Sequence, residues 1–154
     1  MIETPQVITT TAQKTAFIPV TATWDEIQEV MGPGLGEVQS ALANQGIAPI
    51  GPWFAHHKRR PIESFDFEIC VPVAAHVSPV GRVKSKDIPA LKVVTTVYHG
   101  GYENLGKAWG EFHAWLEKSG LSIAEDFYEC YVVGPESGPD SSQYRTQFSI
   151  PLKN

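Results

Sequence analysis

Two glutamates, Glu68 and Glu129, stand among aromatic residues in segments that alternate apolar and polar side chains. Glu68 belongs to FDFEICVPV (residues 65–73) and Glu129 to DFYECYVV (residues 126–133). The face of an aromatic ring attracts a cation by about 0.5–2 kcal/mol, and a carboxylate supplies the counter-charge. Burial and a neighbouring like charge raise a carboxyl pKa, and such a group can also act as a general acid or base. The pattern therefore predicts a site for an aromatic or lipophilic cation, or a catalytic pair of acids.

The face on which Glu68 lies follows from strand periodicity. Neighbouring residues of a strand point to opposite faces, so Phe67 and Ile69 point away from Glu68. If Phe67 and Ile69 pack beneath helices, Glu68 faces an open cleft on the other side of the sheet. The same alternation also occurs in an ordinary half-exposed sheet, in which the glutamate faces water. Both interpretations remain open at this point.

Aromatic residues accompany Glu129 on its own face. Phe127 and Tyr131 lie two positions before and after Glu129 and therefore point the same way. An internal repeat, described below, sets Trp53 and His57 at positions equivalent to Phe127 and Tyr131. The predicted ligand-binding residues are Trp53, His57, Glu68, Phe127, Glu129 and Tyr131.

The histidines give no sign of a metal site. They show no HExxH or other metal-ligand spacing, so we predict no metal and no other cofactor. His57 follows His56, and only one of this pair can face the cleft. Tyr102 follows a Gly-Gly turn, where its simplest role is to shape the turn and pack the start of a helix. No serine or cysteine nucleophile motif is present.

Composition bounds the class of protein. The chain has 154 residues, 42% of them hydrophobic, which suits one globular domain over residues 1–154. Its formal net charge of −5 argues against nucleic acid or an anionic membrane as partner. No signal peptide and no apolar run near membrane-spanning length is found. We therefore expect a cytoplasmic protein in which Cys70 and Cys130 are reduced, with a disulfide between them as the alternative.

Periodicity and turn residues predict the order of elements. A first strand is expected within residues 6–24, and a helix follows the capping-box pattern of Thr23 and Glu26. Gly32-Pro33-Gly34 predicts a break that divides this helix into two pieces before Gly46. A second helix is expected over residues 103–119, with an apolar stripe of Leu105, Trp109, Phe112 and Leu116 and a stop at Gly120, and a loop is expected over 134–143. The other expected strands are 51–58, 65–73, about 91–98, 126–133 and 144–152.

The chain also resembles itself. Gly46 and Gly120, Trp53 and Phe127, and His57 and Tyr131 are each 74 residues apart, and a looser match sets Glu68 opposite Gln147. This similarity predicts two β-α-β-β units, about residues 5–75 and 80–152, related by a pseudo-twofold axis. Neither unit is large enough to be stable alone. We expect an α+β fold of joined antiparallel sheets with both helices on one face and a cleft on the other.

These segments resemble the GyrI-like family, which is related to gyrase inhibitors and to the effector domains of AraC-type regulators. The matching pieces span about residues 5–152: VMGPGLGEVQSALANQGIAPIGPWFAHH, FDFEICVPV, VYHGGYENLGKAWGEFHAWLEKSGL, DFYECYVVGP and YRTQFSIPL. The resemblance implies a central ligand groove, with Glu129 as the family's pocket glutamate for cationic drugs and Glu68 as a second acid. Tyr102 matches the family's Gly-x-Tyr position. The chain departs from the family at Tyr98, His57 and Gln147.

The resemblance implies two classes of function. About ten residues precede the first expected element, which leaves no room for a helix-turn-helix, so we expect a stand-alone, multidrug-type binding protein. Some stand-alone relatives are hydrolases that open the cyclopropane of DNA-alkylating natural products. For this alternative the catalytic candidates are Glu68, Glu129 and Tyr102. A protein partner such as gyrase is a third class, which no acidic run in the sequence supports.

Overall fold

The fold is an eight-stranded antiparallel sheet with two helices. The computed structural model describes residues 2–60 and 64–153. The helices are α1 (Ile27–Asn44) and α2 (Leu105–Ser119), and short 3₁₀ turns are η1 (Tyr102–Asn104), η2 (Pro135–Ser137) and η3 (Ser141–Gln143). The strands are β1 (Gln6–Thr9), β2 (Gln13–Thr23), β3 (Phe54–His57), β4 (Ser64–Pro72), β5 (Lys84–Ile88), β6 (Lys92–His99), β7 (Phe127–Val133) and β8 (Arg145–Pro151). The predicted α+β class is confirmed.

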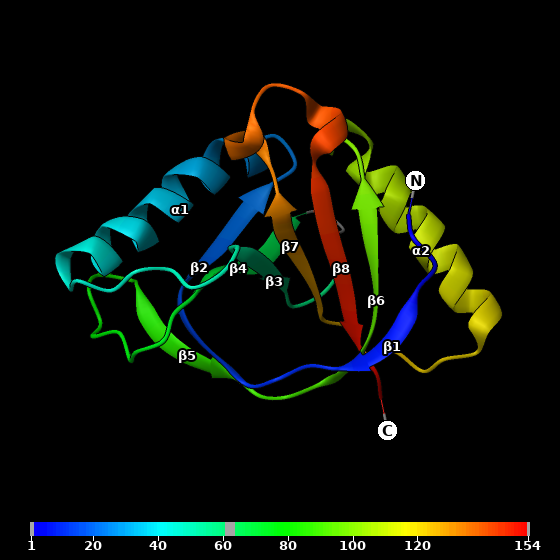
Figure 1. Cartoon of the computed structure of the whole chain (residues 1–154), viewed down its shortest axis with the longest axis horizontal. Helices are drawn as coiled ribbons and strands as arrows, with labels where there is room; N and C mark the ends of the chain where they lie inside the picture. Colours follow the sequence, from blue (N-terminus) through cyan, green and yellow to red (C-terminus); the bar gives the residue numbers. More distant parts are fainter. Residues whose placement is uncertain (1, 61–63, 154) are drawn as a thin grey trace.

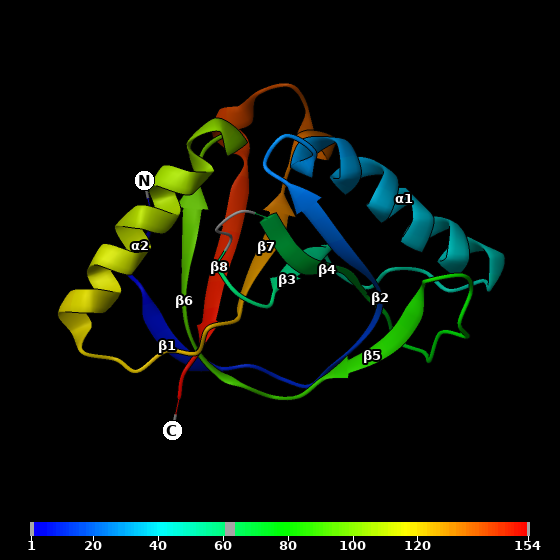
Figure 2. The same ribbon diagram turned by 180° about the vertical axis from the view of Figure 1, so that it is seen from behind.

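The sheet consists of two sets of strands that meet in its middle. The strand order is β1-β6-β8-β7-β3-β4-β2-β5, so β3 and β7 pair at the centre. The elements β2-α1-β3-β4 and β6-α2-β7-β8 follow one another in the same order. Helices α1 and α2 flank the central strands on either side, and β1 and β5 form the two edges (Figures 1 and 2). The centre of the sheet is therefore the place where residues from both sets meet.

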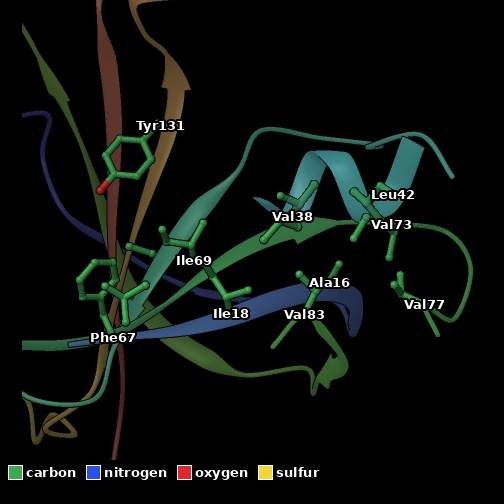
Figure 3. Close-up of a cluster of buried hydrophobic side chains, with 14 of the residues drawn as sticks. Ala16, Ile18, Val38, Leu42, Phe67, Ile69, Val73, Val77, Val83 and Tyr131 are labelled. Carbon is green, nitrogen blue, oxygen red and sulfur yellow. The ribbon is translucent and has the colours of Figure 1, made fainter. Parts of the chain in front are cut away.

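Helix α1 is continuous, so the predicted break at Gly32-Pro33-Gly34 is wrong. The helix contains Pro33 and packs on β2 and β4 through the fully buried Val38 and Leu42 (Figure 3). Gly34 permits the close approach, because a Cβ there would lie 2.6 Å from Cδ1 of Ile69. Burial of this apolar face outweighs the poor helix propensity of the segment.

Helix α2 packs on the other half of the sheet. Its stripe of Ala108, Phe112 and Leu116 is buried against Phe148 and neighbouring apolar side chains of β6–β8. The helix ends where predicted, at Gly120, whose φ of 75° is the left-handed conformation that glycine adopts readily. Both helices therefore cover the same face of the sheet, as expected.

Strand β5 was not predicted. Its sequence, KSKDI, lacks the apolar alternation of a half-buried strand, and it pairs only with β2 at one edge of the sheet. Charged side chains are typical of edge strands, because they discourage pairing with another chain. None of the helices in the described part of the chain is long and apolar enough to cross a membrane.

Candidate functional site

The register of β3, β4 and β7 determines which residues share a face. Ala55 in β3 is paired with Ile69 in β4 and with Glu129 in β7. Ile69 is part of the core beneath α1. Residues directly opposite one another in a sheet point to the same side, so Glu129 lies on the face that carries the helices.

Glu68 lies on the opposite face, so the prediction of one cleft with both acids is wrong. Glu68 is paired with His56, and His56 is paired with Tyr128. His56 is one residue after Ala55, the partner of Glu129. A shift of one residue in register reverses the face. The cleft expected on the helix-free side therefore does not contain Glu129 or its aromatic neighbours.

Glu129 is buried, with 8% of its surface exposed, and it accepts hydrogen bonds from two neutral donors. The Tyr131 hydroxyl donates to Oε1 at 2.6 Å, and the Trp109 indole Nε1–H donates to Oε2 at 2.6 Å. Within residues 2–60 and 64–153, no cationic side chain forms an ion pair with it. Burial raises the pKa of Glu129, and the hydrogen bonds from Tyr131 and Trp109 oppose this only in part.

Aromatic rings enclose Glu129 from the β3 side and from the α2 side. On the first side, the Trp53 and Tyr131 ring centroids are 4.3 Å apart, and Tyr102 meets Tyr131 edge-on at 6.0 Å. On the second side, Trp109 stacks on Phe148 at 4.0 Å and meets Phe127 edge-on at 4.7 Å. We call Glu129 with Trp53, Tyr102, Trp109, Phe127, Tyr131 and Phe148 the acid–aromatic cluster.

The predicted aromatic residues are thus brought together, and one important neighbour was missed. Trp53, Phe127 and Tyr131 lie with Glu129, and Tyr102 contacts Tyr131. Burial raises the pKa of Tyr102 to about 12, with nearby Glu136, Tyr144 and Glu129 adding to the effect. Trp109 was predicted only as part of the apolar stripe of a helix, and no spacing in the sequence relates it to Glu129.

His57 lies on the same face, beside the acid–aromatic cluster. Its imidazole stacks between Phe67 at 5.0 Å and Phe127 at 4.8 Å, and 7% of the residue is exposed. Its Nδ1 atom is buried without a hydrogen-bond partner. Burial, and to a lesser extent His56, lowers the pKa of His57 to about 4, so the imidazole is neutral at pH 7.

On the helix-free face, Glu68 belongs to a paired set of charges. Lys86 Nζ lies 2.6 Å from Glu68 Oε1, and His56 Nδ1 lies 3.5 Å from the same oxygen. His56 also contacts Asp126 at 2.9 Å through Nε2 and stacks on Tyr128 with 4.2 Å between centroids. Burial alone would raise the pKa of Glu68, but contact with His56 and Lys86 lowers it to about 2.

Two surface hollows lie away from Glu129. One, of about 340 Å³, lies between the start of α2 and the turn at Ser141 and Ser142. The other, of about 360 Å³, is lined by Phe17, Pro19, Gly81, Arg82 and Lys84 near the β5 edge. Neither hollow is lined by Glu129, and only 8% of this residue is exposed. No group of three or more metal-ligating side chains is found in the described part of the chain.

The sequence matches a known family of domains over almost its whole length. The profile of the GyrI-like small molecule binding domain matches residues 3–153. The chain belongs to this family. Among curated proteins, no match to the sequence is found.

Several solved structures share the fold. The C-terminal domain of EcmrR has a TM-score of 0.85 at 20% identity, with 98% of each chain covered. In the complex of EcmrR with DNA, this chain spans 57% of the EcmrR chain. SAV2435 bound to tetraphenylphosphonium has a TM-score of 0.68 at 12% identity, with 99% of this chain and 95% of that chain covered. A hydrolase from Listeria innocua has a TM-score of 0.66 at 11% identity, with 97% and 91% covered.

Proposed function

We propose that this GyrI-like domain binds aromatic, lipophilic and often cationic small molecules, with Glu129 as the counter-charge. The observation that carries the proposal is a buried carboxylate that has two neutral hydrogen-bond donors and no ion-pair partner among the described residues. A buried charge without a partner costs several kcal/mol and raises the group's pKa. A bound cation would supply the missing partner.

The surrounding rings suit the same ligand. Trp53 and Tyr131 on one side and Trp109 and Phe127 on the other present flat apolar surfaces around the carboxylate. Such surfaces stack on planar ligands, and their faces attract a positive charge. The neighbouring structure of SAV2435 with tetraphenylphosphonium, an aromatic cation, supports this class of ligand.

Entry of a ligand requires the rings to separate. Trp53 and Trp109 are half-buried and Tyr102 is exposed, whereas Glu129 beneath them is nearly inaccessible. Side-chain rotation of half-buried rings is fast on the time scale of binding. The proposal therefore places the ligand against Glu129 after displacement of the Trp109 indole or the Trp53 ring.

The test is a calorimetric titration of the protein with tetraphenylphosphonium. Glu129→Gln keeps the shape of the side chain and removes its charge, so we expect affinity to fall at least tenfold, or about 1.4 kcal/mol. Glu68→Gln is the matched control, since Glu68 is equally buried on the opposite face and already paired with Lys86. We expect Glu68→Gln to leave the affinity within about twofold. Unchanged affinity in Glu129→Gln would remove the basis of the proposal.

The second candidate is hydrolysis of a cyclopropane-bearing alkylating compound. The raised pKa of Glu129 favours it, because a carboxyl whose pKa burial has raised holds a proton more readily and can act as a general acid or base. In this reaction water forms a C–O bond at the electrophilic carbon as the strained C–C bond breaks. The proton lost by water passes to Glu129, and the substrate gains one from the protein or solvent.

Mass spectrometry separates this candidate from binding alone. A product heavier than the substrate by one water, formed by the wild type and not by Glu129→Gln, would support hydrolysis. Recovery of unchanged substrate, in a protein that binds it through Glu129, would leave binding as the function. Tyr102→Phe tests the third predicted catalytic residue, whose ring lies 6.0 Å from that of Tyr131.

A further inference from the structure

The Nδ1 atom of His57 is buried and has no hydrogen-bond partner within residues 2–60 and 64–153. Only 7% of the residue is exposed, and its ring is stacked between those of Phe67 and Phe127. An unsatisfied buried polar atom costs about 1–3 kcal/mol, and each one in a native protein calls for an explanation. Phenylalanine would fill the same stack without this cost, so packing alone does not explain a histidine at this position.

His57 is close enough to Glu129 for one ligand to reach both. Phe127 is the partner of His57 across β3 and β7, and Ala55, two residues earlier, is the partner of Glu129. Diagonal neighbours in an antiparallel pair are about 7–8 Å apart, which is within the length of a two- or three-ring molecule. Phe127 contacts the His57 ring and the Trp109 ring, and Trp109 donates to Glu129, so a chain of ring contacts connects the two sites.

We propose that the ligand carries an N–H or O–H donor at a distance from its charge, and that this donor bonds to Nδ1 of His57 while the charge lies at Glu129. This inference rests on the function proposed above and narrows its ligand class to aromatic cations with polar hydrogens, such as amino-substituted ring systems. A neutral imidazole with its proton on Nε2 leaves Nδ1 as an acceptor. Cations without an N–H or O–H group, such as tetraphenylphosphonium, would use Glu129 only.

Thr146 offers an internal comparison. Its hydroxyl oxygen is also buried without a partner, and it lies in β8 opposite Tyr131, on the far side of Glu129 from β3. Its side chain is about the size of valine, so Thr146→Val removes the unpartnered hydroxyl and keeps the volume of the side chain. The proposal assigns the ligand's donor to His57 and not to Thr146.

The experiment compares two dyes that share one ring system. Proflavine is an acridinium cation with two exocyclic amino groups, and acridine orange is the same cation with both groups dimethylated and therefore without those N–H donors. Fluorescence titrations with both dyes are made on the wild type and on His57→Phe, Thr146→Val and Glu129→Gln. A hydrogen bond to a neutral group contributes about fivefold in affinity, and one from a charged ligand about tenfold or more.

We expect His57→Phe to weaken proflavine fivefold to tenfold and to leave acridine orange within about twofold. Thr146→Val should change neither dye, and Glu129→Gln should weaken both. His57→Phe should also raise the thermal unfolding midpoint, because it removes an unsatisfied polar atom. Addition of proflavine to the wild type should move the ¹⁵N resonance of His57 Nδ1, which a purely packing role would not produce.

An equal change in affinity for both dyes in His57→Phe would overturn the inference. If Glu129→Gln still lowered the affinity for both dyes, the proposed binding function would stand. Failure of the wild type to bind either dye would overturn both proposals. If His57→Phe does not fold, His57→Leu is measured in its place with the same expected selectivity. Loss of dye selectivity in Thr146→Val would assign the donor to that hydroxyl and also contradict the inference.

Discussion

Glu68 and Glu129 are a natural pair for comparison, because they are equally buried in the strands that flank β3. Glu68 is 6% exposed and Glu129 8%, yet they lie on opposite faces of the sheet. Lys86 holds Glu68 at 2.6 Å and helps lower its pKa to about 2. Glu129 has only the neutral donors of Tyr131 and Trp109, and burial raises its pKa.

The comparison separates a structural acid from a candidate functional one. Burial by itself does not distinguish them, since both side chains are enclosed. The counter-charge does: Glu68 completes an ion pair inside the protein, whereas Glu129 has a charge that no described residue balances. A perturbed pKa indicates a candidate functional residue when the fold removes water from the carboxylate but places no opposite charge beside it.

The largest effect is expected from removing the partner of Glu68. Lys86→Met leaves the buried carboxylate without its cation, and breaking a buried pair in this way costs about 3–5 kcal/mol. Because the Lys86 side chain is 32% exposed, we expect a smaller loss of unfolding free energy, about 2–3 kcal/mol in urea denaturation at neutral pH. Adding Glu68→Gln to this variant should restore most of the loss.

The control is Lys84→Met, since Lys84 lies on the same strand at an exposed position. Substitutions at such positions usually change stability by less than about 0.5 kcal/mol. A Lys86→Met protein as stable as the wild type would show that Glu68 needs no counter-charge. In that case the contrast between the two acids would have no energetic basis.

A second prediction concerns the opposite pH dependence of the two acids. The raised pKa of Glu129 means that the folded state holds this proton more tightly than the unfolded chain. Its contribution to stability is present below the unfolded pKa and is lost as pH rises through the folded pKa. The pKa of Glu68, lowered to about 2, gives the reverse: stabilisation above the unfolded value that is lost as pH falls towards about 2.

Glu129→Gln should therefore make the protein more stable at pH 7, since each pKa unit corresponds to about 1.4 kcal/mol. The amide oxygen can accept from Trp109, and the amide NH₂ can donate to the Tyr131 hydroxyl oxygen, which reverses that hydrogen bond and frees the Tyr131 O–H from this acceptor. Glu68→Gln should instead lower the free energy of unfolding at pH 7. The variant should also lose less of this free energy than the wild type as the pH falls. Urea denaturation between about pH 3 and pH 8 measures both. A less stable Glu129→Gln at pH 7 would contradict an uncompensated charge at this position.

Much of the fold follows from the sequence because its strands and helices carry strong local signals. The apolar stripe of α2 and its stop at Gly120 were predicted within a residue or two. Helix α1 was predicted as two pieces because Gly32-Pro33-Gly34 has low helix propensity. Propensity gives no information about the sheet on which the helix packs. The helix packs on that sheet, where Gly34 lies close to Ile69, a residue far away in the sequence.

The site was predicted in its residues and not in its geometry. Alternation shows that Phe127, Glu129 and Tyr131 share one face of β7. It does not show which residues of β4 lie on that same face of the sheet. That relation depends on β3, whose Ala55 lies opposite Glu129 and whose His56 lies opposite Glu68. The repeat contained a usable signal, because Ala55 and Glu129 are also 74 residues apart, whereas Glu68 corresponds to Gln147.

Trp109→Phe tests how firmly the fold holds the unpaired acid. The phenyl ring can still stack on Phe148 but cannot donate to Glu129, so the carboxylate loses one of its two neutral donors. In the free wild type this indole competes with a cation for the carboxylate. Its removal should therefore tighten tetraphenylphosphonium binding about twofold to fivefold, the equivalent of one hydrogen bond of about 0.5–1 kcal/mol.

Trp115→Phe is the control for this smallest effect, because Trp115 belongs to the same helix and packs in the α2 core without a bond to Glu129. We expect it to leave the affinity unchanged, as measured by the same calorimetric titration. If Trp109→Phe instead weakens binding as strongly as Glu129→Gln, the indole contacts the ligand and does not merely cover the acid. In that case Trp109 would both donate to the carboxylate and contact the ligand. The difference between Glu129 and Glu68 would then come from this hydrogen bond and not from a missing counter-charge.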